Sequence, residues 1–301
     1  MTAQIIDGKE VAKSVRKALK ARIAALKEQG ITPGLAAVLV GDDPASQTYV
    51  NSKAKACEKL GLYSEVIRRP SSLAEADLKA IVHGLNRNER IHGILVQSPL
   101  PKHIDELSVT LTIDPNKDVD GFHPHSVGMM LIGRPILLPC TPHGIVKLLE
   151  YYEIDPAGKE VVVVGRSNIV GKPIAAILMQ KAPMANATVT VAHSRSTNLP
   201  EICRRADILI AAIGRPQTIT AEMVKEGAVV IDVGVNRVDD SSEKGYHLVG
   251  DVDFVTCKEK AAYITPVPGG VGPMTIAMLM SNTVRACERL VGFPGERVHS
   301  E

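Results

Sequence analysis

The chain has 301 residues, enough for two domains of ordinary size, and 45% apolar with 23% charged residues describes a globular protein with an ample core. Its net charge is only +2, its basic residues are dispersed, and it has no Trp and few Phe, so the composition argues against a nucleic-acid-binding protein. No signal peptide, transit segment or apolar run of membrane length is present, which predicts a cytosolic protein without membrane partners. The five cysteines are scattered without metal-ligand spacing, which predicts a reducing compartment and no metal site.

The first half of the chain alternates between helical and strand patterns. Asp7 and Glu10 resemble a capping box before an apolar repeat of helical period, and Gly30 is placed to end that helix. The predicted elements that follow are a strand at 34–41, a helix at 45–60, a strand at 64–68, a helix at 73–85 and a strand that begins at 91. Alternation of this kind predicts a parallel α/β sheet.

The second half repeats the α/β pattern after a stretch, 111–140, that is rich in turn signals and that we interpret as the crossing between domains. A linking helix is expected at 141–152, followed by strands at 161–164, 187–192, 207–212, 228–233 and 263–265. The run 266–275 is too rich in Gly and Pro for a regular element, and a helix at 275–290 is expected to return to the first domain. The predicted domains are therefore 1–139 with 275–301, and 140–274, with a cleft between them.

A glycine turn after four consecutive valines, Val161 to Val164, is typical of a dinucleotide-binding domain. Such a strand is buried on both faces, and an apolar helix pattern follows the turn. Gly165 and Gly171 occupy the outer positions of the usual fingerprint, but Ser167 replaces the middle glycine. The pattern predicts a Rossmann-type fold with a phosphate group at the helix N-terminus, and a tight βα turn without a ligand is the alternative.

The end of the next predicted strand indicates which dinucleotide would bind. An NAD site places a carboxylate there for the ribose, but no Asp or Glu occurs from 181 to 200. Arg166, Ser194 and Arg195 offer guanidinium and hydroxyl groups instead, which suit a 2′-phosphate. The sequence therefore favours NADP over NAD.

Polar residues in the first domain are candidates for chemistry. Tyr49 and Lys53 are four residues apart and share one face of a predicted helix, although a solvated lysine beside a core tyrosine would give the same pattern. Gln97 follows a buried strand at the edge where α/β sheets bind ligands, and capping of a turn is its alternative role. Asp118 and Asp120 alternate about an apolar residue, and an Asx turn could account for one of them. His143 and His193 are interpreted as structural.

Taken together, these motifs resemble a known enzyme family over nearly the whole chain. The motifs are Tyr49-x-x-x-Lys53, Val96-Gln97-x-Pro99-Leu100-Pro101, Lys117-Asp118-Val119-Asp120-Gly121, Gly165-Arg166-Ser167-x-Ile169-Val170-Gly171-x-Pro173 and Pro268-Gly269-Gly270-Val271-Gly272-Pro273-Met274-Thr275. The sequence resembles bifunctional methylenetetrahydrofolate dehydrogenase/methenyltetrahydrofolate cyclohydrolase. The resemblance implies a homodimer of two-domain subunits, with folate in the cleft and NADP on the C-terminal domain.

The resemblance also implies residue roles. Lys53 would be the catalytic lysine, with Tyr49 beside the pterin and Gln97 in contact with Lys53, and Asp120 would anchor the pterin ring. The folate side of the cleft would be shaped by Pro268, Gly269 and Gly270. The residues that would line NADP are Gly165, Arg166, Ser167, Ser194 and Val235, the last of which stands where the family often has isoleucine.

The implied function belongs to one-carbon metabolism. It is the NADP-dependent oxidation of 5,10-methylenetetrahydrofolate to 5,10-methenyltetrahydrofolate, followed by hydrolysis to 10-formyltetrahydrofolate. A lysine in a partly desolvated cleft could take and return the protons that hydrolysis needs, so one site could serve both reactions. Two alternatives are another NADP-dependent dehydrogenase, acting on a hydroxy acid or carbonyl compound, and a non-catalytic NADP-binding regulator.

Overall fold

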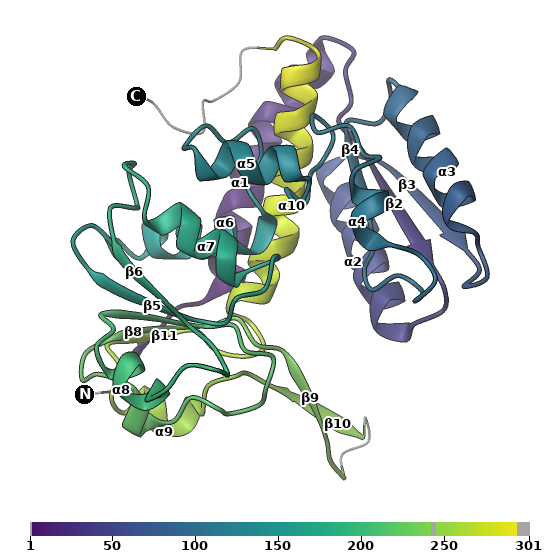
Figure 1. Cartoon of the computed structure of the whole chain (residues 1–301). Coiled ribbons are helices and arrows are strands. Elements are labelled where there is room, and N and C mark those ends of the chain that lie inside the picture. Colours follow the sequence, from purple (N-terminus) through teal and green to yellow (C-terminus); the bar gives the residue numbers. More distant parts are fainter. Residues whose placement is uncertain (1, 242–244, 294–301) are drawn as a thin grey trace. The chain divides into compact units, whose positions relative to one another are not determined.

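The computed structural model describes residues 2–241 and 245–293, and the chain divides into two compact units. The first unit comprises Ser14–Cys140 and Ile276–Glu301, and the second comprises Met1–Lys13 and Thr141–Thr275. The chain passes between the units within α1 (Gly8–Glu28), at the start of α6 (Cys140–Tyr151) and within α10 (Val271–Leu290) (Figure 1).

The first unit is built on a three-stranded parallel sheet of order β3-β2-β4. Its strands are β2 (Gly34–Val40), β3 (Tyr63–Arg69) and β4 (Gly93–Val96), and its shorter helices are α2 (Pro44–Leu60), α3 (Glu75–Arg87), α4 (Glu106–Thr110) and α5 (Pro124–Leu131). Every residue of the central strand β2 is buried, as its apolar sequence requires, and α2 packs on β2 and β3 while α3 packs on β4. The predicted parallel α/β sheet is confirmed.

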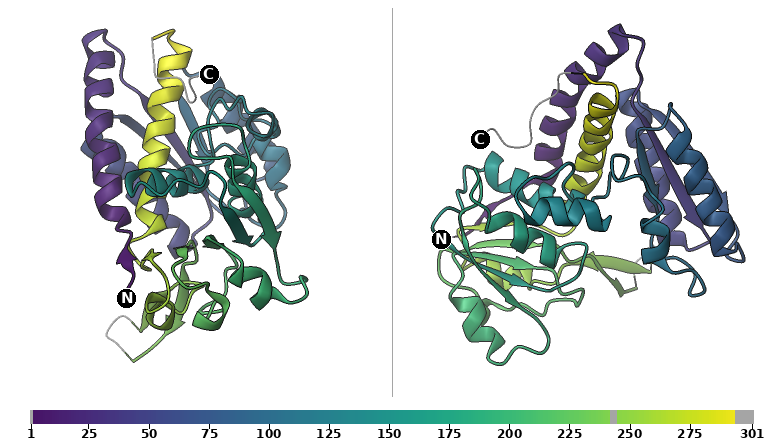
Figure 2. Two further views of the ribbon diagram at one scale, coloured as in Figure 1. Left: turned by 90° about the vertical axis from the view of Figure 1, so that its left-hand side faces the viewer. Right: turned by 45° about the horizontal axis from the view of Figure 1, so that its top comes forward.

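The second unit contains a six-stranded parallel sheet of order β1-β11-β8-β7-β5-β6. Its strands are β1 (Gln4–Ile5), β5 (Glu160–Val164), β6 (Thr188–Ala192), β7 (Ile208–Ala211), β8 (Val229–Asp232) and β11 (Tyr263–Ile264); β9 (Asn236–Asp239) and β10 (Tyr246–Val249) form a separate antiparallel hairpin. The helices α6 and α7 (Gly171–Leu178) cover one face of the sheet, and α8 (Leu199–Arg204) and α9 (Phe254–Lys258) cover the other (Figures 1 and 2). A 3₁₀ turn occupies Ala221–Met223. This arrangement, a parallel sheet with helices on both faces, is the predicted Rossmann-type fold.

The four valines of β5 occupy the middle of this sheet because both of their faces are covered. All four are at most 1% exposed. Val162 and Val164 belong to an apolar cluster that includes Cys203 of α8 and Cys257 of α9. Full burial of a valine contributes roughly 1.5–3 kcal/mol, so this strand anchors the turn that follows it.

The structure corrects two sequence predictions. β1 pairs with β11, so residues 1–13 belong to the second unit, whereas the sequence assigned 1–139 to one domain. Helix α10 begins at Val271, inside the predicted Gly/Pro loop. Pro273 is tolerated there because it lies in the first turn, where a backbone N–H would have no acceptor within the helix. The stretch 111–140, interpreted as the crossing between domains, ends where the first unit ends, at Cys140, and it also contains α5, which starts at Pro124 and is capped by the His123 side chain.

The predicted capping box at the start of α1 forms only in part. Asp7 Oδ1 accepts hydrogen bonds from Lys9 N and Glu10 N, as an N-cap does. The Glu10 carboxylate accepts from the Tyr151 hydroxyl instead of returning to Asp7, and Asp7 N donates to the Tyr152 hydroxyl. Tyr151, the last residue of α6, and Tyr152, which follows it, therefore complete this cap.

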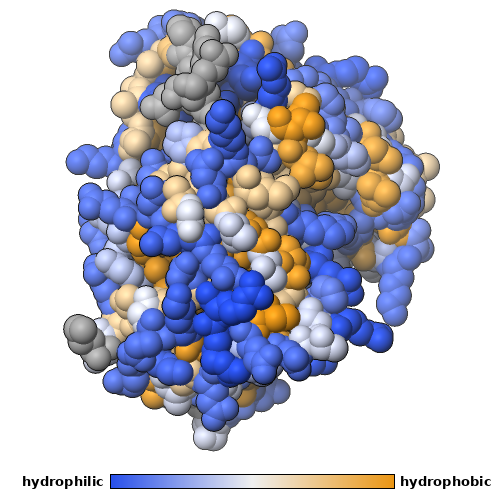
Figure 3. All heavy atoms as spheres, turned by 60° about the vertical axis from the view of Figure 1, so that its left-hand side comes forward, coloured by the Kyte–Doolittle hydropathy of each residue, from blue (hydrophilic) through white to orange (hydrophobic). Residues whose placement is uncertain are grey.

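On the face drawn in Figure 3, apolar side chains form several separate groups within a polar surface. Across the described residues, no helix has the length and apolar character needed to cross a membrane.

Candidate functional site

Helix α2 presents Tyr49 and Lys53 on one face. The helix is firmly terminated, because Asp43 accepts a hydrogen bond of 2.7 Å from Ser46 N at its start and Gly61, with φ of 72°, ends it in the left-handed region. Tyr49 is 50% exposed, and Lys53, one turn later, is half-buried. The buried residues of α2 are Ser46, Val50, Cys57 and Leu60, and Lys53 lies on the same stripe, between Val50 and Cys57. Its side chain therefore leaves from the packed side of the helix, whereas Tyr49 lies at the edge of that stripe.

Gln97 follows β4 directly and contacts Lys53. Lys53 Nζ donates a hydrogen bond of 2.9 Å to Gln97 Oε1. Gln97 Nε2 donates to Ser98 O at 2.6 Å, which leaves Oε1 as the amide atom that faces the lysine. The expected contact between the two residues is present, and it lies at the carboxyl edge of the sheet.

The two aspartates of the Lys117–Gly121 motif have different surroundings. Asp118 is 2% exposed and accepts hydrogen bonds from Gly121 N, His123 N and Ser126 Oγ at 2.8–3.1 Å. Asp118 is therefore the residue of the Asx-type turn. Asp120 is half-buried and has no such turn partners among the described residues, so its carboxylate remains available to a ligand.

Asp120 lies within the electrostatic influence of Lys53. Burial raises the pKa of Asp120 to about 6, the nearby Lys53 ammonium opposes that rise, and Asp118 adds to it. Burial and the Asp120 carboxylate likewise raise the pKa of the Cys140 thiol well above its usual value. Lys53, Gln97 and Asp120 therefore form one cluster of an amine, an amide and a carboxylate within the first unit.

Asn282 of α10 supports this cluster, and the sequence analysis did not single it out. It is 2% exposed, and its Nδ2 donates to Val119 O and Leu138 O, both at 2.8 Å. It thereby fixes the backbone next to Asp120. The available signal was an amide within an otherwise apolar helical stretch, which usually marks a buried hydrogen-bond donor.

In the second unit, the turn after β5 has the geometry that the glycine pattern predicts. Gly165 has φ of 133°, and a Cβ there would lie 2.1 Å from Ala212 O. A Cβ at Gly171 would lie 2.2 Å from Gly165 O, so the helix start packs directly on the turn. Ser167 Oγ accepts from Val170 N and Gly171 N at 3.2 and 3.4 Å, so the residue in place of the middle glycine holds the turn against the first residue of α7.

The other predicted cofactor-binding residues follow neighbouring strands of the same sheet. Ser194 and Arg195 follow β6, and Val235, 49% exposed, follows β8. Arg166, Ser194 and Arg195 are all exposed, and neither guanidinium forms an ion pair within the described part of the chain. A glycine turn at a helix start, with unneutralised cations beside it, fits a phosphorylated dinucleotide.

The loop with Pro268, Gly269 and Gly270 belongs to the second unit. Gly269 has φ of 117°, and Gly270 N donates to Pro266 O at 2.8 Å, so the loop is a tight turn that requires glycine. A Cβ at Gly8 would lie 1.7 Å from Gly270 O, which shows how closely the start of α1 packs on it.

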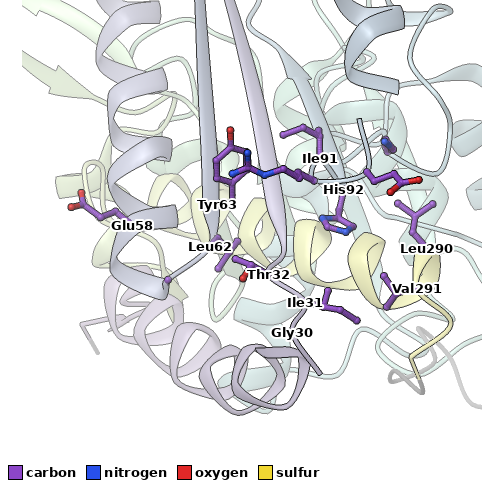
Figure 4. A pocket seen from close by; sticks show the side chains of 14 residues that line it. Gly30, Ile31, Thr32, Glu58, Leu62, Tyr63, Ile91, His92, Leu290 and Val291 are labelled. Carbon is purple, nitrogen blue, oxygen red and sulfur yellow. The ribbon is translucent and has the colours of Figure 1, made fainter. Parts of the chain in front are cut away.

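A cavity of about 940 Å³ lies at the opposite edge of the first unit's sheet (Figure 4). Tyr63, at the start of β3, and His92, just before β4, line it together with Leu290 of α10. His92 Nδ1 accepts from Gly34 N at 3.1 Å, and burial, with the Lys117 ammonium nearby, lowers the pKa of His92. Because Gln97 stands at the carboxyl edge and this cavity at the amino edge, the two are separate features of the unit.

Family models match both halves of the chain. Residues 6–120 match the model described as tetrahydrofolate dehydrogenase/cyclohydrolase, catalytic domain, and residues 139–291 match the model described as tetrahydrofolate dehydrogenase/cyclohydrolase, NAD(P)-binding domain. These ranges cover the Lys53 cluster and the glycine turn, respectively.

Individual relatives match over almost their full length. The chain is 57% identical to the bifunctional protein FolD of Moorella thermoacetica over 289 residues, which is 96% of this chain and 100% of that one. The crystal structure of the bifunctional FolD enzyme of Campylobacter jejuni has a TM-score of 0.91 and 47% identity, and covers 96% of this chain and 99% of its own. A Trypanosoma brucei FolD structure, complexed with NADP cofactor and inhibitor, has a TM-score of 0.92 and 41% identity, with 97% and 99% covered.

Proposed function

This chain belongs to the tetrahydrofolate dehydrogenase/cyclohydrolase family, and we propose that the Lys53 cluster is the site at which it carries out both reactions of its family. The reactions are the oxidation of 5,10-methylenetetrahydrofolate to the methenyl compound and the hydrolysis of that compound to 10-formyltetrahydrofolate. The alternatives raised by the sequence, a dehydrogenase of another substrate and a non-catalytic regulator, leave the Lys53–Gln97 pair and Asp120 without a role.

Folate would be held by the exposed groups of the cluster. Asp120 offers a carboxylate, which only accepts hydrogen bonds when ionised and therefore suits the ring N–H and amino donors of a pterin. Tyr49 is half-exposed one turn before Lys53, where its ring can lie beside the pterin. We assign Asp120 and Tyr49 to binding, and the loop of Pro268, Gly269 and Gly270 to the folate side of the second unit.

NADP would be held by the residues at the carboxyl edge of the six-stranded sheet. Gly165, Arg166 and Ser167 surround the start of α7, Ser194 follows β6 and Val235 follows β8. When bound, NADP accepts the hydride that leaves the methylene carbon of the substrate. The nitrogen lone pairs of the substrate drive that departure, so this step requires positioning by the protein rather than an acid or a base.

The hydrolytic step requires proton transfer. Water that attacks the methenyl carbon must lose a proton, and the departing N5 must gain one. Lys53 Nζ is the titratable group held toward the site by Gln97, and we assign both transfers to it. Gln97 accepts from Nζ and so fixes the direction of the lysine side chain; its own amide does not titrate.

The hydrogen bond between Lys53 and Gln97, with Asp120 close by, is the observation that carries this proposal. It is tested by incubating the protein with methylenetetrahydrofolate and NADP while NADPH and methenyl absorbance are followed together. NADPH without lasting methenyl absorbance is expected, because hydrolysis removes the intermediate. The proposal is wrong if NADPH does not form.

We extend the proposal to a homodimer located in the cytosol. All five cysteines are unpaired and buried, as a reducing compartment allows.

The dimer is tested by light scattering, which should give twice the mass of one chain for the purified protein. A mass equal to one chain at micromolar concentration would contradict the dimer.

A further inference from the structure

Asp251 connects two loops at the carboxyl edge of the six-stranded sheet. It is fully buried, at 0% exposed. Its carboxylate accepts hydrogen bonds from the consecutive amides of Ile213, Gly214 and Arg215 at 2.6–3.0 Å. It also accepts from Asn236 Nδ2 at 2.9 Å. One side chain therefore fixes the loop after β7 and the segment that follows β8.

A second buried carboxylate fixes Asp251 itself. Asp232, 3% exposed at the end of β8, accepts from Asp251 N, Val252 N and Gly234 N at 2.9–3.0 Å. A Cβ at Gly234 would lie 2.2 Å from Asp251 Oδ1, and a Cβ at Gly250 would lie 1.7 Å from Asp232 Oδ2. Both glycines are required by the two carboxylates, so the packing leaves these loops little freedom.

The place of these loops in the sheet order determines which half of NADP would lie over them. This step rests on the proposed function. The turn after β5 suits the pyrophosphate, and Ser194 after β6 suits the phosphorylated ribose of the adenosine half. In the sheet order, β7 and β8 lie on the other side of β5. A dinucleotide that crosses the edge at β5 must therefore extend its nicotinamide half over the loops that Asp251 holds.

We propose that Asp251 is a positioning residue for the nicotinamide half of NADP. It acts through the loop Ile213–Arg215 and, through Asn236, on the adjacent exposed residue Val235. An ionised carboxylate can accept all four hydrogen bonds, because it has two oxygens and no donor. In Asp251→Asn, an NH₂ group replaces one of the two carboxylate oxygens. Its N–H donors would face the N–H donors that this oxygen accepts from, so those hydrogen bonds would be lost and one of the loops would be released.

The test compares two ligands that differ by the nicotinamide half. Calorimetry measures the binding of NADP and of adenosine 2′,5′-bisphosphate to the full chain and to the variants Asp251→Asn and Asn236→Ala. Loss of hydrogen bonds to a buried charge should weaken NADP binding by about 10-fold in Asp251→Asn, and by less in Asn236→Ala, where three donors remain. Binding of the bisphosphate and cyclohydrolase activity without cofactor should change by less than about twofold.

The matched control is Asp207→Asn. Asp207 also accepts a backbone hydrogen bond, from Glu160 N at 2.9 Å, but it precedes β7 and so lies at the opposite edge of the sheet. This variant should bind both ligands as the unmodified protein does. Should Asp251→Asn not fold, Asn236→Ala carries the same comparison.

Two results would overturn the positioning role. Unchanged NADP affinity in both variants would show that the loops do not depend on Asp251. A parallel loss of both ligands would make Asp251 a residue of general stability. An unmodified protein that bound neither ligand would instead overturn the assignment of NADP to this sheet edge, on which the positioning role rests.

Discussion

Lys53 Nζ lies 2.9 Å from Gln97 Oε1, although Lys53 stands in the middle of α2 and Gln97 directly follows β4. The hydrogen bond gives the lysine a fixed direction at the edge of the sheet where ligands bind. A flexible side chain held in this way loses less entropy when it takes up its position in a reaction. The pair is therefore the first place at which the proposed mechanism can be tested.

Replacement of Lys53 by methionine should separate the two activities. Met keeps most of the side-chain length but has no titratable nitrogen, and a positioned general acid or base contributes roughly 10²–10⁴-fold. Cyclohydrolase activity should fall by about that factor, and dehydrogenase activity should fall far less. Methenyltetrahydrofolate should then accumulate in the coupled assay, where its absorbance measures it directly.

Lys55→Met is the matched control for this experiment. Lys55 is an exposed lysine two residues along the same helix, so its loss changes the charge of α2 but not the site. Both activities of this control should remain at the level of the unmodified protein. An equal loss of both activities in Lys53→Met would make Lys53 a binding residue and not a proton carrier.

Asp120 should control folate binding through its ionisation. Asp120→Ala should impair both activities through weaker folate binding and leave NADP affinity unchanged.

The pH dependence of the unmodified protein tests the same role. The pKa of Asp120 is about 6, and its carboxyl group is an ionised acceptor only above that value, so kcat/KM for the folate substrate should fall as pH drops below about 6. Lys53→Met removes a cation that lowers this pKa, so the residual dehydrogenase profile should shift to higher pH. A shift to lower pH, or unchanged folate affinity in Asp120→Ala, would contradict the assignment.

Arg166→Ala tests the preference for NADP. A hydrogen bond from a charged donor contributes roughly 1.5–3 kcal/mol, so NADP binding should weaken by about that amount while NAD binding changes little. Affinities measured by calorimetry for both dinucleotides decide the question. Arg205→Ala, which removes an exposed guanidinium paired with Glu160, is the control and should affect neither. Equal losses for both dinucleotides in Arg166→Ala would mean that Arg166 does not distinguish them.

Much of the fold could be predicted from sequence because the buried strands have continuous apolar runs, as in Val161–Val164. Contacts set by tertiary pairing could not be predicted in this way. The two residues of β1 carry no local signal and are strand only because they pair with β11. Asp251 looks like an ordinary loop aspartate in the sequence and Asp232 falls within the predicted strand 228–233, and only the folded chain shows which amides they accept from. Of the site, motif and spacing indicated Lys53, Gln97 and Asp120, but not the supporting Asn282.

Asp120→Asn should stabilise the protein at neutral pH and lose that effect in acid. The pKa of Asp120 is about 6 in the folded chain against an ordinary value of 3.8, so the folded state holds its proton more tightly than the unfolded state. The stability that the bound proton contributes is fully present below pH 3.8 and is lost as pH rises through about 6, and the loss amounts to up to about 3 kcal/mol. Asparagine carries no charge and avoids this loss. Urea unfolding at several pH values measures the free energy of unfolding of the variant and of the unmodified protein. The difference between them should be largest above pH 7 and should close toward pH 4. A gap that stays constant over this range would mean that burial of the Asp120 charge is not what the substitution relieves.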